Sequence, residues 1–213
     1  MAVRKVVTRT GRGFRGRFQS RKMGRPIDWE SLLEQDAIYH FEFCTQVVSY
    51  QEQPEMIEFW VEGKRHVYFP DFELVLRNGE IIHVEVKPKN KLKNPDLRKR
   101  LQHIEAHYQR RGIRFLILTE DQIRNKVVLD NLKQLAYHCR WELNDEGLLA
   151  ATEAMTILPA ATVDGARAVL GSERDVYRLL ATGAYVCDLH QPINGHTAIW
   201  AASGENSYVT FSL

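Results

Sequence analysis

The sequence predicts an α/β fold, a mixed sheet flanked by helices over residues 26–141, with a small C-terminal domain over residues 142–213. Two observations lead to this class. The apolar patterns predict, in chain order, a helix, antiparallel strands, a helix, a strand and a helix. A polar break at Asn144–Gly147 then precedes short helical patterns and two strand-like runs. Helices followed by a short hairpin are typical of a winged-helix-like module.

Length and composition place the chain among globular proteins. Its 213 residues are enough to bury a sizeable core, and 44% hydrophobic with 26% charged residues argues against wholesale disorder. No apolar run approaches the ~20 residues of a membrane span. The three cysteines, Cys44, Cys139 and Cys187, form no C-x-x-C pair and suit a reducing compartment. We therefore expect a soluble cytoplasmic protein with no membrane partner.

The first predicted helix begins at Asp28, whose side chain can cap it, and runs to about Phe43. Glu30 and Glu34 both lie near the edge of its apolar stripe. Either carboxylate could reach a buried metal site, and either could be solvated. The spacing does not choose between them.

The later elements are predicted from alternation and from capping residues. They are strands at Val47–Gln51 and Met56–Val61, a hairpin over Phe69–Lys87, a helix capped by Asn94 that begins with Pro95 and ends near Arg111, a strand over Ile113–Leu118, a helix from the capping box Thr119–Gln122 to about Tyr137, a helix over Ser172–Ala181, and strands at Tyr185–Leu189 and Thr197–Ala201.

The hairpin Phe69–Lys87 carries the strongest functional signal. Asp71 stands at the start of one alternating run, and Glu85 and Lys87 stand near the end of the next. A two-residue turn would set Asp71 opposite Val86, whereas a three-residue loop with a left-handed Gly79 sets it opposite Glu85. A shift of one residue would exchange the two faces, so the loop length decides which side chains meet.

Apolar segregation favours the three-residue loop, Arg77–Gly79. In that register one face is apolar and carries Phe72, Leu74, Leu76, Ile82, Val84 and Val86. The other face carries Asp71, Glu73, His83, Glu85 and Lys87. Two carboxylates and an ammonium on one face can hold a divalent cation and activate a water, as in a nuclease. The alternative is a hairpin with a solvated charged face, because short motifs carry a high risk of false positives.

The positive charge of the chain is concentrated in residues 1–25. This segment contains no carboxylate, and its cations are Arg4, Lys5, Arg9, Arg12, Arg15, Arg17, Arg21, Lys22 and Arg25. Glycines among them and the interleaved Phe14 and Phe18 predict a flexible arm without a core of its own. Beside a nuclease site, such an arm would contact DNA. The alternative is a solubilising tail.

Several spaced motifs in order resemble TnsA, the restriction-like endonuclease subunit of Tn-seven-type bacterial heteromeric transposases. The resemblance runs from about Arg4 through His138. Its motifs are Trp29-Glu30-Ser31-Leu32-Leu33-Glu34, Ser49-Tyr50-Gln51-Glu52-Gln53-Pro54, Tyr68-Phe69-Pro70-Asp71-Phe72, Val84-Glu85-Val86-Lys87-Pro88 and His107-Tyr108-Gln109-Arg110-Arg111-Gly112.

The resemblance implies a PD-(D/E)xK endonuclease domain over residues 26–141, with a restriction-endonuclease-like sheet. The family's acidic residue on the first helix falls on Glu34, its metal-binding Asp on Asp71, its next ligand on Glu85 and its lysine on Lys87. A further acidic position on the helix after the hairpin matches Glu105.

The resemblance also implies a reaction and partners. The carboxylates would hold Mg²⁺, with Mn²⁺ as a substitute, and the enzyme would cut the 5′ ends of a transposon during cut-and-paste transposition. A DDE transposase, TnsB, would cut the 3′ ends, and an ATPase regulator, TnsC, would dock on the C-terminal domain. The alternatives are a stand-alone restriction-like nuclease or junction resolvase, and a non-catalytic DNA-binding assembly subunit.

Overall fold

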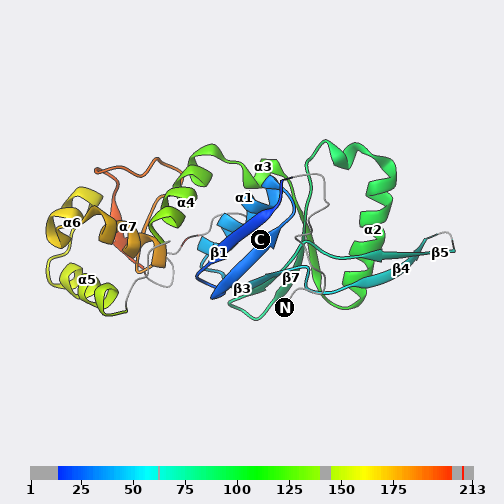
Figure 1. Cartoon of the computed structure of the whole chain (residues 1–213), viewed down its shortest axis with the longest axis horizontal. Coiled ribbons are helices and arrows are strands. Elements are labelled where there is room, and N and C mark those ends of the chain that lie inside the picture. The colour runs from blue at the N-terminus through cyan, green and yellow to red at the C-terminus, as the bar shows by residue number, and fades with distance from the viewer. Residues whose placement is uncertain (1–13, 62, 140–144, 203–207, 209–213) are drawn as a thin grey trace. The chain divides into compact units, whose positions relative to one another are not determined.

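The computed structural model describes residues 14–61, 63–139, 145–202 and 208, and its contacts divide the chain into two compact units (Figure 1). The first unit comprises the described residues up to Glu42 together with Gln46–Arg124. The second comprises Phe43–Thr45 and the described residues from Asn125 onward. Each unit is described by itself.

A four-stranded mixed sheet forms the centre of the first unit. Its strands are β3 (Val47–Glu52), β6 (Phe72–Leu76), β7 (Ile81–Val86) and β8 (Arg114–Leu118), in that order across the sheet. β3, β6 and β7 are antiparallel neighbours, and β8 runs parallel to β7. The parallel pair needs a crossover, which a helix between β7 and β8 supplies. The predicted mixed sheet flanked by helices is confirmed.

The three-residue loop between β6 and β7 is also confirmed. Phe72 pairs with Val84 and Val75 with Ile81, so the same register sets position 71 opposite position 85. The Leu76 N–H donates to the Glu80 carbonyl at 2.8 Å, which closes the loop. Gly79 has φ +84°, the left-handed conformation that this loop requires.

Helices cover both faces of this sheet (Figure 1). On the apolar face, α1 (Leu32–Phe43) packs Phe41 against Phe72 with ring centroids 5.3 Å apart. On the polar face, α2 (Pro95–Arg110) packs Tyr108 against His83 at 4.4 Å. α2 follows a short 3₁₀ turn, η1 (Lys91–Lys93). The polar face is therefore enclosed, which excludes the solvated-face alternative for His83 and Glu85, both 2% exposed.

Some of the helices begin where the sequence predicts, and others do not. Asn94 caps α2 as predicted. α1 begins later than expected, because Asp28 lies in a strand and Ser31 accepts the Glu34 N–H at 3.2 Å instead. The helix expected after Thr119 is divided into α3 (Glu120–Ile123) and α4 (Lys126–Cys139). A second cap separates them, since the Asn125 side chain accepts from the Val128 N–H at 3.2 Å.

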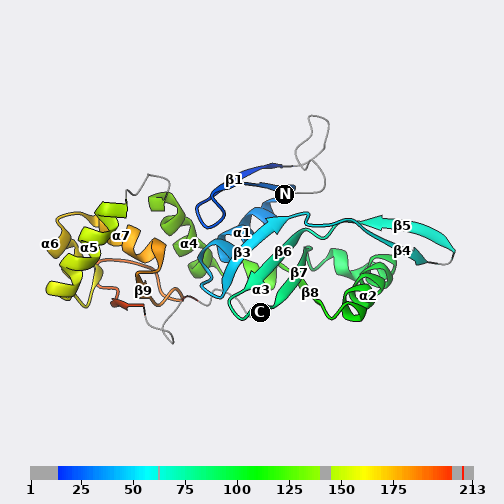
Figure 2. The same cartoon turned by 90° about the horizontal axis from the view of Figure 1, so that it is seen from below.

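A second hairpin extends beside α2 and is formed by β4 (Ile57–Val61) and β5 (Lys64–Tyr68) (Figures 1 and 2). One of its faces joins the apolar face of α2 in a core cluster. The buried members of that cluster are Ile57, Phe59, Tyr68, Leu101, Ile104 and Tyr108.

The expected flexible arm is wrong over residues 16–25. There β1 (Gly16–Ser20) pairs with β2 (Arg25–Trp29). Apolar alternation provides this hairpin with a buried face, since Phe18 packs against Tyr39 at 5.1 Å and Ile27 is fully buried. Gly16 serves close packing here, because a Cβ at that position would lie 2.4 Å from the Trp29 ring.

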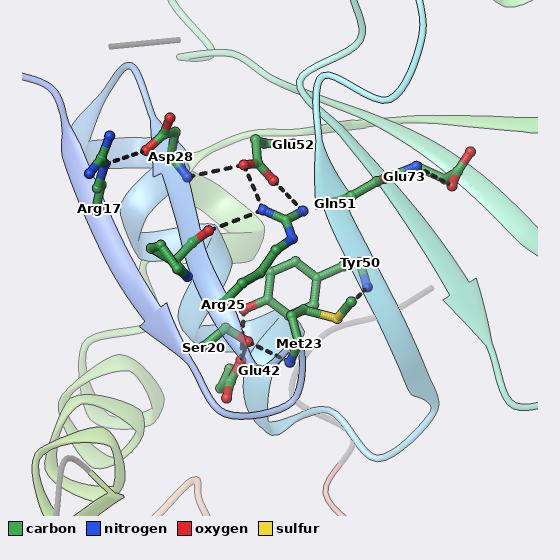
Figure 3. A network of polar contacts seen from close by, with 11 residues as sticks. Arg17, Ser20, Met23, Arg25, Asp28, Glu42, Tyr50, Gln51, Glu52 and Glu73 are labelled. Carbon is green, nitrogen blue, oxygen red and sulfur yellow. Dashed lines mark hydrogen bonds and ion pairs between the residues drawn. The ribbon is translucent and has the colours of Figure 1, made fainter. Parts of the chain in front are cut away.

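Two of the nine cations predicted to contact DNA make hydrogen bonds within the first unit. Arg25 forms a two-pronged ion pair with the buried Glu52, at 2.8 and 2.7 Å (Figure 3). The Lys22 ammonium donates to the carbonyls of Phe41 and Val47 at 2.7 and 2.8 Å. Both side chains join the β1–β2 hairpin to the body of the unit, and their contact with DNA stays a prediction.

We predict that Arg25→Ala destabilises the protein by about 3 kcal/mol, because it leaves the Glu52 carboxylate buried without its counter-ion. Arg17→Ala is the matched control. Arg17 pairs with Asp28 at 3.0 Å on the surface, and losing such a pair costs less than about 1 kcal/mol. Urea unfolding of both variants measures the difference. Equal destabilisation by the two would contradict the assigned role of Arg25.

The described residues of the second unit form four helices and a two-stranded hairpin. Its elements are α4, α5 (Asp145–Ile157), α6 (Val163–Leu170), α7 (Glu173–Thr182), β9 (Tyr185–Cys187) and β10 (Ile199–Ala201). α4 joins α7 through the stacked rings of His138 and Tyr177, 4.4 Å apart. The predicted helix near residues 172–181 and the following hairpin are present. The winged-helix-like assignment stays a prediction.

The division between the units falls at Arg124–Asn125, before α4, whereas the composition of the sequence changes near residue 141. Within the described part of the chain, no helix combines the length and apolar character that crossing a membrane would require.

Candidate active site

Asp71, Glu85 and Lys87 line one pocket of about 330 Å³ in the first unit. Asp71 directly precedes β6, Glu85 lies near the end of β7, and Lys87 follows that strand. The pocket is completed by α2, which contributes Leu97, Arg100, Leu101 and Ile104. The hairpin register therefore brings together three residues that the sequence predicted, under the cover of a helix.

Lys87 lies between the two carboxylates. Its ammonium is 2.5 Å from Glu85 Oε1 and 3.4 Å from Asp71 Oδ2. Asp71 Oδ2 also accepts the Val86 N–H at 2.8 Å, which fixes the carboxylate against the end of β7. Each member of this cluster is thus held by another or by the backbone.

Tyr68 is a site residue that reasoning from residue patterns missed. Its hydroxyl donates a hydrogen bond to Glu85 Oε2. The Arg100 guanidinium lies over the Tyr68 ring, 5.9 Å from the centroid. The only signal in the sequence was the place of Tyr68 in the motif that also contains Asp71.

Glu34 lies close to the pocket but does not line it. Its carboxylate accepts the Glu30 N–H at 2.7 Å and the Ser31 hydroxyl at 2.9 Å, so it closes the start of its own helix. Burial, and then the charge of Asp71, raise the pKa of Glu34 to about 7. Glu30 does line the pocket. The structure therefore brings both carboxylates near Asp71, and it ties Glu34 to helix capping as well.

Burial and mutual repulsion shift the ionisation of this cluster. Burial, followed by the charge of Asp71, raises the pKa of Glu85 to about 8, and burial also raises the pKa of Asp71. Burial lowers the pKa of the Lys87 ammonium, but the charges of Asp71 and Glu85 outweigh this and the net pKa is raised. One ammonium cannot neutralise three carboxylates, so the fully ionised cluster would have two excess negative charges.

That charge excess fits a divalent cation. Mg²⁺ is typically held by one or two carboxylates and keeps several waters, and Asp71 and Glu85 provide such a pair. Among the residues that the structure describes, no group of three or more His, Cys, Asp or Glu side chains is arranged to hold a metal ion. Glu34 faces its helix start and Lys87 lies between the other two carboxylates, which explains this result.

Gln53 also lines the pocket and is unusual in two respects. Its φ is +41°, a left-handed value that is uncommon for a residue with a side chain. The residue is 7% exposed, and among the residues that the structure describes its Oε1 has no hydrogen-bond partner. Its backbone N–H donates to the Asp71 carbonyl at 3.0 Å, which joins it to the start of β6.

The remaining predicted site residues that the structure describes do not line the pocket. Glu105 is exposed on α2 and does not line it. Arg4, Lys5, Arg9 and Arg12 lie outside the described residues. Arg17 and Arg21 are exposed, and Arg15 lies 3.8 Å from Glu30.

Comparison with known proteins gives one family. Residues 44–120 match the model of the TnsA-like endonuclease N-terminal domain. No curated protein matches the chain. The matched segment contains Gln53, Asp71, Glu85 and Lys87, and over this segment the chain is similar to TnsA-like endonucleases.

Proposed function

We propose that this chain is a metal-dependent DNA endonuclease that cuts the 5′ ends of a transposon together with a TnsB-like DDE transposase. One observation carries the proposal. Within a TnsA-like segment, Asp71, Glu85 and Lys87 are brought to one pocket by the register of a single hairpin. A nuclease of the TnsA type is what the family match supports.

In this proposal Asp71 and Glu85 hold Mg²⁺ or Mn²⁺, with Glu34 as a further carboxylate beside them. When bound, the ion would neutralise the scissile phosphate and lower the pKa of an attacking water. Lys87 orients that water or stabilises charge on the pentavalent phosphorus in the transition state. Tyr68 fixes the Glu85 carboxylate through its hydroxyl.

The partners are proposed on the same basis. The DNA substrate is the transposon end, and the exposed cations near the N-terminus, Arg17 and Arg21, contribute phosphate contacts. The second unit, with its proposed winged-helix-like character, is the docking surface for a TnsC-like ATPase. Fold alone does not assign that role, since such modules bind both DNA and proteins.

The test is cleavage of a transposon-end DNA with and without the DDE transposase, in Mg²⁺ and in chelator. We expect 5′-strand cuts only when the transposase and the metal are both present. Cutting by the chain alone would favour a stand-alone nuclease or junction resolvase. Transposition that survives loss of both Asp71 and Glu85 would favour a non-catalytic assembly subunit.

A further inference from the structure

A second cavity of about 490 Å³ lies between the β4–β5 hairpin and α2. Its lining residues come from both elements, and they are Phe59, Val61, Lys64, His66, Asp96, Leu97, Lys99 and Arg100. Leu97 and Arg100 also line the pocket that contains Asp71 and Glu85. The groove and the candidate active site are therefore neighbours with two residues in common. We call this cavity the α2 groove.

Exposed cations that form no ion pair among the described residues line the α2 groove or lie on the elements next to it, and one carboxylate, Asp96, also lines it. Lys64 and Lys99 line it, and Lys91, Lys93 and Arg98 lie on η1 and the first turns of α2. Among the described residues, none of these five forms an ion pair. Elsewhere on the surface, exposed cations such as Arg17, Lys89, Arg111, Arg114 and Lys126 are each paired with a carboxylate. Exposed cations without an ion pair among the described residues therefore lie on the elements that form this groove, beside the candidate active site.

We propose that the α2 groove binds the phosphates of the DNA strand that leads to the scissile bond. A polyanion is the occupant that unpaired cations recognise, and contact with phosphates supplies most sequence-independent affinity for DNA. The shared residue Arg100 joins the groove to the catalytic pocket, because its guanidinium donates to the Val67 carbonyl at 3.2 Å beside Tyr68. This inference rests on the proposed nuclease function and names the path of its substrate.

The test is DNA binding by the full chain in chelator, where no cleavage occurs. The variant Lys64→Ala/Lys99→Ala removes two exposed cations, and Lys126→Ala, an equally exposed lysine of the second unit, is the control. We expect the double variant to bind DNA at least tenfold more weakly. Its salt dependence should be less steep by about two in the logarithmic slope, since each phosphate contact contributes about 0.9. Lys126→Ala should bind like the wild type.

The possible outcomes separate this inference from the proposed function. If the double variant bound DNA with the affinity and the salt dependence of the wild type, the proposal that the groove is a DNA site would be overturned. Unchanged DNA binding with loss of transposase binding would assign the groove to an acidic protein segment and overturn it equally. If the wild-type chain bound no DNA in any salt, the proposed function would fail as well.

Gln53 carries a second inference from separate observations. A strained backbone and a buried acceptor without a partner are each unfavourable, and together they mark positions where a site, rather than the fold, sets the conformation. We infer that Gln53 Oε1 accepts a hydrogen bond from a water of the metal's hydration shell. The pocket provides Mg²⁺ with two carboxylates, so bound waters would need acceptors in the wall. This inference also rests on the proposed function.

The test is calorimetric titration of the full chain with Mg²⁺. Gln53→Gly relieves the positive φ and removes the acceptor, whereas Gln53→Glu keeps an acceptor oxygen. We expect Mg²⁺ affinity to fall by about tenfold or more in Gln53→Gly, as for other residues that orient a metal site, and to be kept in Gln53→Glu. Gln51→Ala, whose amide binds Glu73 at 3.0 Å, is the control and should bind normally.

A structural role for Gln53 predicts a different pattern. Wild-type Mg²⁺ affinity in Gln53→Gly would overturn the inference, and so would equal weakening by Gln53→Gly and Gln53→Glu. Absence of Mg²⁺ binding by the wild-type chain would overturn the proposed function and this inference with it.

Discussion

Asp71→Ala should reduce 5′-end cleavage by on the order of a thousandfold or more, because losing a metal ligand removes several kcal/mol of stabilisation from the transition state. Asp71 is held in the pocket by the Val86 N–H and by Lys87. It lies within the TnsA-like segment and opposite Glu85 in the hairpin register. The measurement is single-turnover cleavage of labelled transposon ends in Mg²⁺ with the transposase present.

The control for this variant is its affinity for DNA, measured without cleavage. Asp71→Ala should keep DNA affinity in chelator, since the groove cations are untouched, and Glu105→Ala should keep cleavage because that side chain is exposed outside the pocket. Undiminished 5′-strand cutting by Asp71→Ala would remove the proposed mechanism. Loss of DNA binding in the same variant would mean that the carboxylate supports the fold rather than the chemistry.

Mg²⁺ affinity should rise by more than about tenfold between pH 6 and pH 8, because the ion must displace protons from the carboxylates. Glu34 and Glu85, with pKa values of about 7 and about 8, hold protons at pH 6 and release most of them by pH 8, so the ion displaces fewer protons at the higher pH. The measurement is calorimetric titration with Mg²⁺ at intervals of half a pH unit. An affinity that did not depend on pH would contradict the assigned ionisation of the site.

The same protons make the stability of the metal-free protein fall with rising pH, whereas Mg²⁺ affinity rises. Both folded pKa values lie above the 4.5 of a free glutamate, so the folded state binds more protons than the unfolded state between pH 4.5 and pH 8. Stability should therefore fall as pH rises through this window, and Mg²⁺ should restore it. The pKa of Lys87 is raised, so its ammonium stays charged throughout this pH window and its contribution to stability does not change with pH. Glu34→Gln should flatten the fall, whereas Glu105→Gln should not.

The hairpin that carries Asp71 and Glu85 could be predicted from sequence because its pattern is local. Six apolar side chains on one face, together with Gly79, allow only the register that faces Asp71 with Glu85. Capping residues such as Asn94 and Ser172 likewise act within one turn of the chain, and both begin the predicted helices. Such signals need no knowledge of the tertiary fold.

Features that depend on distant contacts could not be predicted in the same way. The many cations of the N-terminal segment obscured the alternation that buries Ile27 and packs Phe18 against α1, and no local pattern pairs Arg25 with Glu52. The structure brings both Glu30 and Glu34 near Asp71, and it alone shows that Glu34 caps its helix. Gln53 was visible only as part of a shared motif, since its backbone conformation has no signature in the sequence.

The loop Arg77–Gly79 limits which insertions and deletions the sequence of this protein can tolerate. It lies at the far end of the hairpin from Asp71, on the surface and without a chemical role of its own. Yet one residue gained or lost there would exchange the faces of β7 and direct Glu85 toward α1. The loop is free to change its composition around Gly79 but not its length. In this chain an insertion as small as one residue, distant from the pocket, would therefore be as damaging as removal of a carboxylate.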